Sequence, residues 1–267
     1  MPNTNFSQLK KVFLDYTKKF YSKNSEVQQN IILKEEHTLR VLNNAEIICD
    51  SLDCSNNLKF LAKVSALFHD IGRFEQFSKY NTFDDSISEN HAKLSVKILE
   101  EQNILSELSK EESKLIIDSI RVHNMFKIPK EYSKDTLLLS KILRDADKLD
   151  ILKVVTDYYE VMDKDKNSAI EHNLPDTKQY SKVIVQDILN NKNSENKYVK
   201  TRNDMRLMKL TWIFDINFPI TLKLILERKY IEKTMKVLPK NEDMEKIYQH
   251  IIMYIKECKC KSTNKTF

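Results

Sequence analysis

Glycine occurs only once in this chain of 267 residues, at position 72. At an ordinary usage of about 7%, roughly nineteen glycines would be expected. The Walker phosphate loop, the dinucleotide-binding fingerprint and glycine-based hairpin turns each need glycine at fixed positions. The sequence therefore excludes these features. Together with a proline count of only five, the lack of glycine favours a mostly helical fold.

The charged residues are numerous but mixed in sign along the chain. Lys and Arg number 44 against 39 Asp and Glu, which gives a net charge of +5. Because the two signs are interspersed, this mild excess is not typical of a protein that binds a long nucleic acid. We expect a small-molecule substrate and no long nucleic acid as partner. The sequence carries no signal for an oligomeric state.

Two further patterns bear on location. The N-terminal residues lack an apolar core segment, and no apolar stretch approaches 18 residues, so we expect neither a signal peptide nor a membrane span. The four cysteines form no regular framework that would indicate disulfides. These patterns predict a protein of the reducing cytoplasm.

The spacing of apolar residues predicts helices through most of the chain and no strand, so the predicted fold class is all-α. The stretch 73–90 is polar and predicts a loop, whereas 135–162 and 219–236 each predict one helix. We expect one compact domain. Its parts are an N-terminal helix (1–30), a helical core (31–162), a loop (163–178) and a C-terminal helical extension packed on the core (179–267).

Four of the six histidines lie on apolar faces of the predicted helices. They are His37, His69, His91 and His123. A single histidine in such a place is usually a core residue with one polar partner. Four imidazoles facing one interior are costly to desolvate unless their nitrogen atoms are used. The pattern therefore points to a site that uses these nitrogens.

Aspartates accompany the histidines. Asp70 directly follows His69, and Asp147 and Asp150 lie about 60° apart on one helix, whereas Asp145 points away from Asp147. Two carboxylates on an otherwise apolar helix face need partners, and cations would serve. Imidazole and carboxylate ligands without thiolate suit borderline divalent metals such as Mn, Fe, Co, Ni or Zn.

Three segments carry a resemblance to the HD superfamily of metal-dependent phosphohydrolases: HTLRV from His37, SALFHDIGRF around His69 and Asp70, and LRDADKLDI around Asp147. The resemblance covers roughly residues 30–160. It implies an HD-type helical core that binds metal, with additional C-terminal helices. NHAKLSVKIL around His91 and IRVHN around His123 resemble the branch of the superfamily that binds two metals.

The resemblance implies a ligand set. One divalent ion (Mn, Fe, Ni, Co, Zn or Mg) would take His37, His69, Asp70 and Asp147. A second would take His91 and His123, with Asp70 as a bridge. If only one ion binds, these two histidines would contact phosphate or act as a general acid. No organic cofactor is expected.

The resemblance also implies roles beside the metals. Asp70 would be the central catalytic ligand, and Arg73 and Lys148 would neutralise charge on the phosphoryl group. Asp150 would accept a hydrogen bond from a ligand histidine and fix its tautomer. The GYP tripeptide of the cyclic-dinucleotide phosphodiesterases is absent, so cyclic di-GMP is not the favoured substrate.

The expected activity is hydrolysis of a phosphomonoester, phosphodiester or pyrophosphate bond, in a nucleotide or a related phosphorylated metabolite. Two alternatives remain open at this point. One is a di-iron oxygenase that uses the same ligands, and the other is a non-catalytic sensor or binding protein that contains metal. In the C-terminal part, LTWIFDINF would either stack on a base or form core with helix caps.

Overall fold

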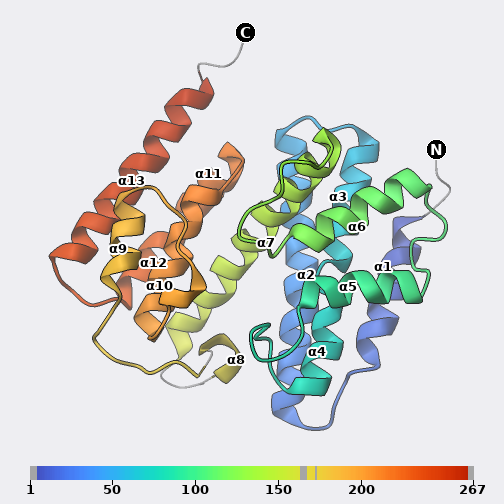
Figure 1. Ribbon diagram of the computed structural model, residues 1–267, viewed down its shortest axis with the longest axis horizontal. Helices are drawn as coiled ribbons and strands as arrows, with labels where there is room; N and C mark the ends of the chain where they lie inside the picture. Colours follow the sequence, from blue (N-terminus) through green and yellow to red (C-terminus); the bar gives the residue numbers. More distant parts are fainter. Residues whose placement is uncertain (1–4, 163–166, 172, 264–267) are drawn as a thin grey trace. The chain divides into compact units, whose positions relative to one another are not determined.

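The computed structural model describes residues 5–162, 167–171 and 173–263 (Figure 1). Within these ranges all regular structure is helical and no strand occurs, which confirms the all-α prediction. None of the helices there is long and apolar enough to cross a membrane. The chain divides into two compact units, Met1–Asp150 and Ile151–Phe267.

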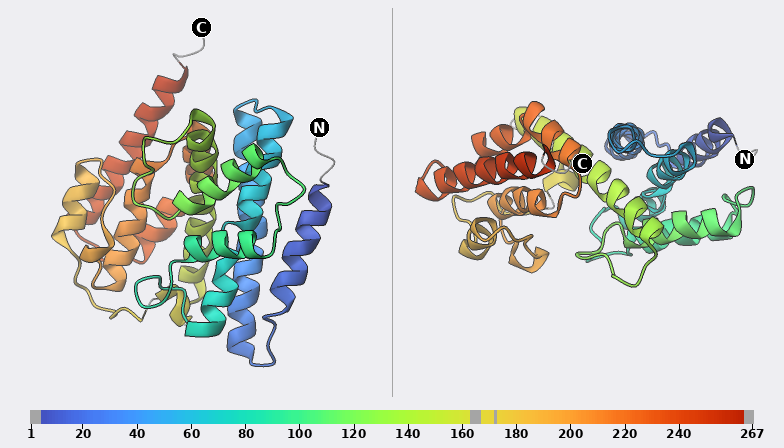
Figure 2. Two further views of the ribbon diagram at one scale, coloured as in Figure 1. Left: turned by 45° about the vertical axis from the view of Figure 1, so that its right-hand side comes forward. Right: turned by 90° about the horizontal axis from the view of Figure 1, so that it is seen from above.

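The first unit is built around a pair of neighbouring helices, α2 and α3 (Figures 1 and 2). α3 also packs against α1 and α6, and α5 packs against α4 and α6. At the centre of one contact, the buried ring of Phe13 meets Phe68 and Phe74 edge to face, with ring centroids 6.3 and 6.0 Å apart. The helices are α1 (Phe6–Lys18), α2 (Ser25–Ser51), α3 (Asn56–Phe68), α4 (Gly72–Tyr80), α5 (His91–Glu101), α6 (Lys110–Val122) and the first part of α7 (Lys134–Val161).

Side chains at the helix starts explain several of these boundaries. The side chains of Asn24, Ser55 and Asn90 accept hydrogen bonds from the first free backbone N–H groups of α2, α3 and α5. Ser109 and Glu112 form a reciprocal capping box at the start of α6. Because Asn90 fixes the first turn of α5, it also fixes the position of His91, the first residue of that helix.

The prediction of a loop over 73–90 is wrong in its first half, because Gly72–Tyr80 forms helix α4. Gly72 allows α4 and α5 to approach each other closely. A Cβ atom on Gly72 would lie 2.7 Å from both the carbonyl oxygen of His91 and the backbone nitrogen of Ser95. The N–H of Gly72 donates to Ser95 Oγ (2.9 Å), and that hydroxyl donates to the carbonyl of His69 (2.8 Å). α4 ends instead at Asn81, whose φ of 51° is left-handed.

The second unit contains the end of α7 and the C-terminal helices. α10 packs on α9, and α13 packs on α9, α11 and α12. The single helix predicted over 219–236 is two helices, since Lys229 breaks it with a φ of 57°. The elements are α8 (Ser168–Glu171), α9 (Lys182–Leu189), the 3₁₀ turn η1 (Asn196–Tyr198), α10 (Arg202–Thr211), the 3₁₀ turn η2 (Trp212–Asp215), α11 (Pro219–Glu227), α12 (Tyr230–Lys236) and α13 (Glu242–Thr263).

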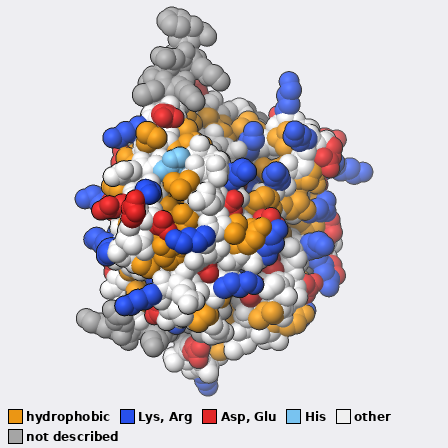
Figure 3. Space-filling view, turned by 60° about the vertical axis from the view of Figure 1, so that its left-hand side comes forward, with side chains coloured by type: hydrophobic (Ala, Val, Ile, Leu, Met, Phe, Trp, Pro, Cys, Tyr) orange, Lys and Arg blue, Asp and Glu red, His pale blue; other side chains and the backbone are white. Residues whose placement is uncertain are grey.

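Part of the segment 163–178, for which the sequence predicted a loop, is described. The short helix α8 lies inside it, whereas residues 163–166 and 172 lie outside the described residues. On the molecular face in Figure 3, Lys and Arg side chains are spread among Asp, Glu and hydrophobic side chains. That face therefore shows the same mixture of charge signs as the sequence.

The close approach at Gly72 generates a stability prediction. We expect Gly72→Ala to destabilise the protein by about 1–3 kcal/mol, because the new methyl group must push α4 and α5 apart. Urea denaturation followed by circular dichroism measures the change. Lys93→Ala is the matched control, since Lys93 is exposed on α5 and its loss should change the stability by less than about 0.5 kcal/mol. Equal stability of Gly72→Ala and the wild type would contradict the packing role.

Candidate metal centre

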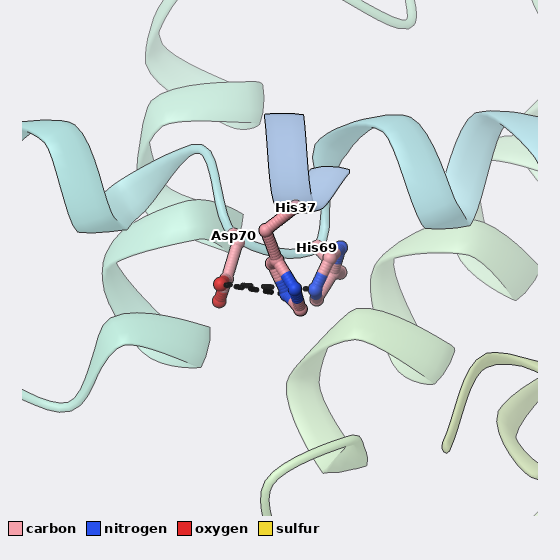
Figure 4. Close-up of side chains that lie close together, drawn as sticks. All are labelled: His37, His69 and Asp70. Atoms are coloured by element: carbon pink, nitrogen blue, oxygen red, sulfur yellow. Dashed lines mark ion pairs between the residues drawn. The ribbon is translucent and has the colours of Figure 1, made fainter. Parts of the chain in front are cut away.

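The six side chains predicted as metal ligands, four histidines and two aspartates, lie together in the first unit. His37 projects from the middle of α2, and His69 and Asp70 follow the last turn of α3 (Figure 4). The other three come from the start of α5, the end of α6 and the middle of α7, and they are His91, His123 and Asp147. Helix ends thus supply four of the six side chains.

One side of the centre is formed by His37 and His69. The Nε2 atom of His37 lies 3.2 Å from Asp147 Oδ1 and 3.6 Å from Asp70 Oδ2. The Nε2 atom of His69 lies 3.6 Å from the same Asp147 oxygen and 3.8 Å from the same Asp70 oxygen. Two imidazole nitrogens and two carboxylate oxygens therefore face a common point.

The other side of the centre is formed by His91 and His123. Their Nε2 atoms lie 3.0 Å from each other. They lie 3.5 and 4.0 Å from Asp70 Oδ1, the carboxylate oxygen that does not face His37. Asp70 therefore stands between two pairs of imidazoles, with one oxygen turned to each pair.

The second nitrogen of every imidazole is hydrogen-bonded outward. The Nδ1 atoms of His69 and His123 lie 2.8 and 2.6 Å from the carbonyl oxygens of Ala66 and Ile120. Because a carbonyl oxygen can only accept, each of these Nδ1 atoms carries the hydrogen and each Nε2 keeps its lone pair. Metal-binding histidines are usually oriented in this way.

Carboxylates orient the other two imidazoles. His37 Nδ1 lies 2.7 Å from Asp150 Oδ2, and Arg40 Nε donates to the other oxygen of Asp150 at 2.7 Å. His91 Nδ1 lies 2.6 Å from Asp85 Oδ2. Asp150 thus lies beside His37, one of the histidines predicted as metal ligands. Asp85 is a residue that the sequence reasoning missed.

The residues present fit a divalent cation. The Nε2 atoms of His37 and His69 are fully buried and have no hydrogen-bond partner among the described residues. A buried polar atom without a partner costs free energy that a bound cation would recover. Three overlapping groups of these side chains have ligand atoms within 4.8 Å of one another. Imidazole and carboxylate are ligands for Mn, Fe, Co, Ni or Zn.

The two central carboxyl groups are held in the charged form. Burial alone would raise the pKa of Asp70, but Lys34, Arg73 and the neighbouring imidazoles hold it well below its usual range. Burial opposes the charge of Asp147 as well, but the nearby imidazoles of His37 and His69 still hold its pKa well below the usual range. Both aspartates are therefore ready to bind a cation at neutral pH.

The imidazoles differ in their affinity for a proton. Burial, and then the charges of its neighbours, lower the pKa of His123 to about 3. Burial and the charge of Arg73 also lower the pKa of His91. Burial would lower the pKa of His37 too, but the nearby carboxylates of Asp147 and Asp150 outweigh burial and leave that pKa raised. A cation bound beside His37 would compete with a proton for this imidazole, so its binding should be stronger at high pH than at low pH.

Arg73 is tied into a hydrogen-bond network at the edge of the centre. Its NH1 group donates to Gln76 Oε1 (2.8 Å), the carbonyl of Phe83 (2.5 Å) and Asp85 Oδ1 (2.9 Å). Its Nε lies 3.5 Å from Asp70 Oδ1, and its NH2 lies 3.4 Å from His91 Nε2. One edge of the guanidinium is therefore anchored, and the other edge faces the ligands.

Three further cations surround the centre. Lys34, which the sequence reasoning missed, places Nζ 2.9 Å from Asp70 Oδ2; its only sequence signal is its place three residues before His37 on α2. Lys148 is buried on α7, next to Asp147 in sequence. Arg144 donates to the carbonyls of His123 and Met125, which holds the end of α6 beside α7.

Comparison with known proteins agrees with this geometry. The family model of the HD domain matches residues 35–152, a range that contains all six side chains of the centre. Neither the curated proteins nor the solved structures gave a match. Residues 35–152 therefore match the HD domain, a family that consists in general of metal-dependent hydrolases.

Proposed function

We propose that this protein is a phosphohydrolase that uses divalent metal ions to cleave a phosphate ester or anhydride bond in a nucleotide or a related phosphorylated metabolite. One observation carries the proposal. All four imidazoles turn Nε2 inward onto two carboxylates, while each Nδ1 is hydrogen-bonded outward. Such an arrangement is built to hold cations, and the HD family uses cations for phosphate chemistry.

Two metal positions are supported better than one. Asp70 Oδ2 faces His37 and His69, and Asp70 Oδ1 faces His91 and His123. Asp147 completes the first set. The close approach of the Nε2 atoms of His91 and His123, 3.0 Å, supports a cation beside the second pair, because both nitrogens would then point lone pairs at it.

Divalent cations bound at these positions would lower the pKa of a water molecule and stabilise charge on the phosphoryl oxygens. The chain itself would bind and orient the phosphate. The free edge of Arg73, whose Nε has no hydrogen-bond partner among the described residues, faces the ligands and would donate to phosphoryl oxygens. Lys34 and Lys148 would add positive charge close to Asp70 and Asp147.

The rim of the centre supports a substrate with an apolar part. Asn124 Nδ2 donates to Asp85 Oδ2 at 3.2 Å, which joins the loop after α4 to the loop after α6. These two loops expose the apolar side chains of Ile87, Met125 and Phe126. A nucleotide would combine a phosphate for the metals with a base for such side chains.

The first prediction concerns turnover. Wild-type protein with Mn²⁺ should release phosphate or nucleoside from at least one member of a panel of mono-, di-, cyclic and dinucleoside phosphates. Asp70→Ala should reduce turnover to the level of chelator-treated wild type, because both metal sets lose a ligand, while far-UV circular dichroism stays the same. Asp118→Ala is the matched control: Asp118 is equally buried but pairs with Lys114 and Arg121 on its own helix.

Two outcomes would contradict the proposal. Retained turnover in Asp70→Ala would refute the assignment of the centre. No turnover across the panel from protein that still holds metal would refute the hydrolase and favour the oxygenase or the sensor.

The second prediction concerns the number of metal ions. His91→Ala should lower the metal content from two ions per chain to one, because it removes a ligand of only one set. Plasma mass spectrometry of dialysed protein measures the content, and His250→Ala, far along the chain in α13, is the control. An unchanged content in His91→Ala would mean that only one ion binds, with His91 left to contact phosphate.

The third prediction concerns Asp85. Asp85→Asn should weaken binding of the second metal ion by about 10–100-fold, because His91 loses the carboxylate that orients it. Competition with a fluorescent chelator measures the affinity. Asp84→Asn is the neighbouring control, since Asp84 Oδ1 accepts only from Ser86 in the same loop. Equal affinities of the two variants would show that Asp85 does not position His91.

A further inference from the structure

In the second unit, helix α10 carries three basic residues along one face, at the helical spacing i, i+4 and i+7. They are Arg202, Arg206 and Lys209. All three line a small cavity of about 20 Å³, together with Tyr158 and Tyr159 of α7 and Glu171 of α8. A cavity of this volume admits one group of the size of a water molecule.

Only the first of these cations is neutralised. The guanidinium of Arg202 lies 2.8 Å from Glu171 Oε2 and 3.3 Å from Asp176 Oδ2. The other oxygen of Glu171 accepts from the hydroxyl of Tyr158 at 2.6 Å. The one carboxylate of the cavity is therefore already committed to Arg202 and Tyr158.

The second cation, Arg206, is buried and has neutral partners alone in the described part of the chain. Its NH1 donates to Asn203 Oδ1 (2.9 Å) and to the carbonyl of Val237 (3.0 Å). The ring of Tyr159 lies 5.4 Å from its guanidinium carbon. These contacts satisfy N–H groups, but they leave the positive charge without a counter-charge.

The third basic residue, Lys209, is 6% exposed, and its side chain forms no hydrogen bond or ion pair with any residue that the structure describes. A buried ammonium group is rare unless it is paired, because its loss of hydration costs several kcal/mol. Burial, and then the charge of Arg206, lower the pKa of Lys209 to about 7. Arg206 and Lys209 thus line one cavity, and no carboxylate of the described residues forms an ion pair with either.

We propose that this cavity is a binding site for a divalent oxyanion, namely inorganic phosphate or the phosphate group of a small molecule, with one oxygen entering between Lys209 and Arg206. A doubly charged anion matches these two basic side chains, for which the described residues supply no counter-charge, whereas chloride or a carboxylate would match one. Arginine together with lysine is a common pair for phosphate. This site is separate from the metal centre, and it does not depend on the phosphohydrolase proposal.

Calorimetric titration of the full-length protein with inorganic phosphate tests the proposal. The protein is first treated with chelator, so that metal ions cannot bind phosphate, and the ionic strength is kept constant. We expect one phosphate per chain. Lys209→Met should weaken binding by about thirtyfold or more, because it removes one partner of a buried charge pair. Lys223→Met is the matched control, since Lys223 is a solvent-exposed lysine of α11, and should bind like the wild type.

Proton uptake gives a second readout that needs no variant. The groups that face Lys209 are the guanidinium groups of Arg202 and Arg206, the carboxylate of Glu171 and the hydroxyls of Tyr158 and Tyr159. Burial raises the pKa of both tyrosines, which keeps them neutral. Because burial and the charge of Arg206 lower the pKa of Lys209, phosphate binding at pH 8 should be accompanied by proton uptake, measured in buffers of different ionisation enthalpy.

Equal affinity for inorganic phosphate and glycerol 3-phosphate would support a site that recognises the phosphate group alone. Tighter binding of one of the two would identify the ligand as free phosphate or as the phosphate group of a small molecule. The proposal is overturned if the wild type does not bind phosphate, if chloride binds as tightly as phosphate, or if Lys209→Met binds like the wild type. If Lys209→Met fails to fold, Lys209→Gln replaces it, and phosphate binding by that variant as tight as by the wild type overturns the proposal.

Discussion

The first unit depends on the burial of one carboxylate, that of Asp70, among four imidazoles and two basic side chains. Its two oxygens face different histidine pairs, at 3.6 and 3.8 Å on one side and 3.5 and 4.0 Å on the other. An isolated carboxylate in such a place would be protonated. Here Lys34 and Arg73 keep Asp70 charged, so a negative charge inside the first unit is available to a bound cation.

The ends of three helices of the first unit bring His69, His91 and His123 close to Asp70. The close approach of α4 to α5 at Gly72 is part of this arrangement. The same Ser95 hydroxyl accepts from Gly72 and donates to the carbonyl of His69, so α5 is tied directly to the residue before Asp70. The single glycine of the chain lies at this contact.

The sequence predicted which side chains come together at the centre better than it predicted the residues around them. Helical spacing placed four histidines on buried faces, and the structure brings these residues together with Asp70 and Asp147. It did not predict α4, because a glycine that allows close packing resembles a glycine that stops a helix. It also did not predict the place of Asp85 beside His91 or the burial of Lys209 at a cavity, since both depend on contacts between distant segments. Asp145, expected to point away from Asp147, is buried too.

Anomalous diffraction from crystals grown with Mn²⁺ tests the central claim most directly. We expect two anomalous peaks in each chain, on opposite sides of the Asp70 carboxylate. One should lie beside His37, His69 and Asp147, and the other beside His91 and His123. A single peak would contradict the bridging role of Asp70. The absence of any peak at these side chains would contradict the metal centre itself.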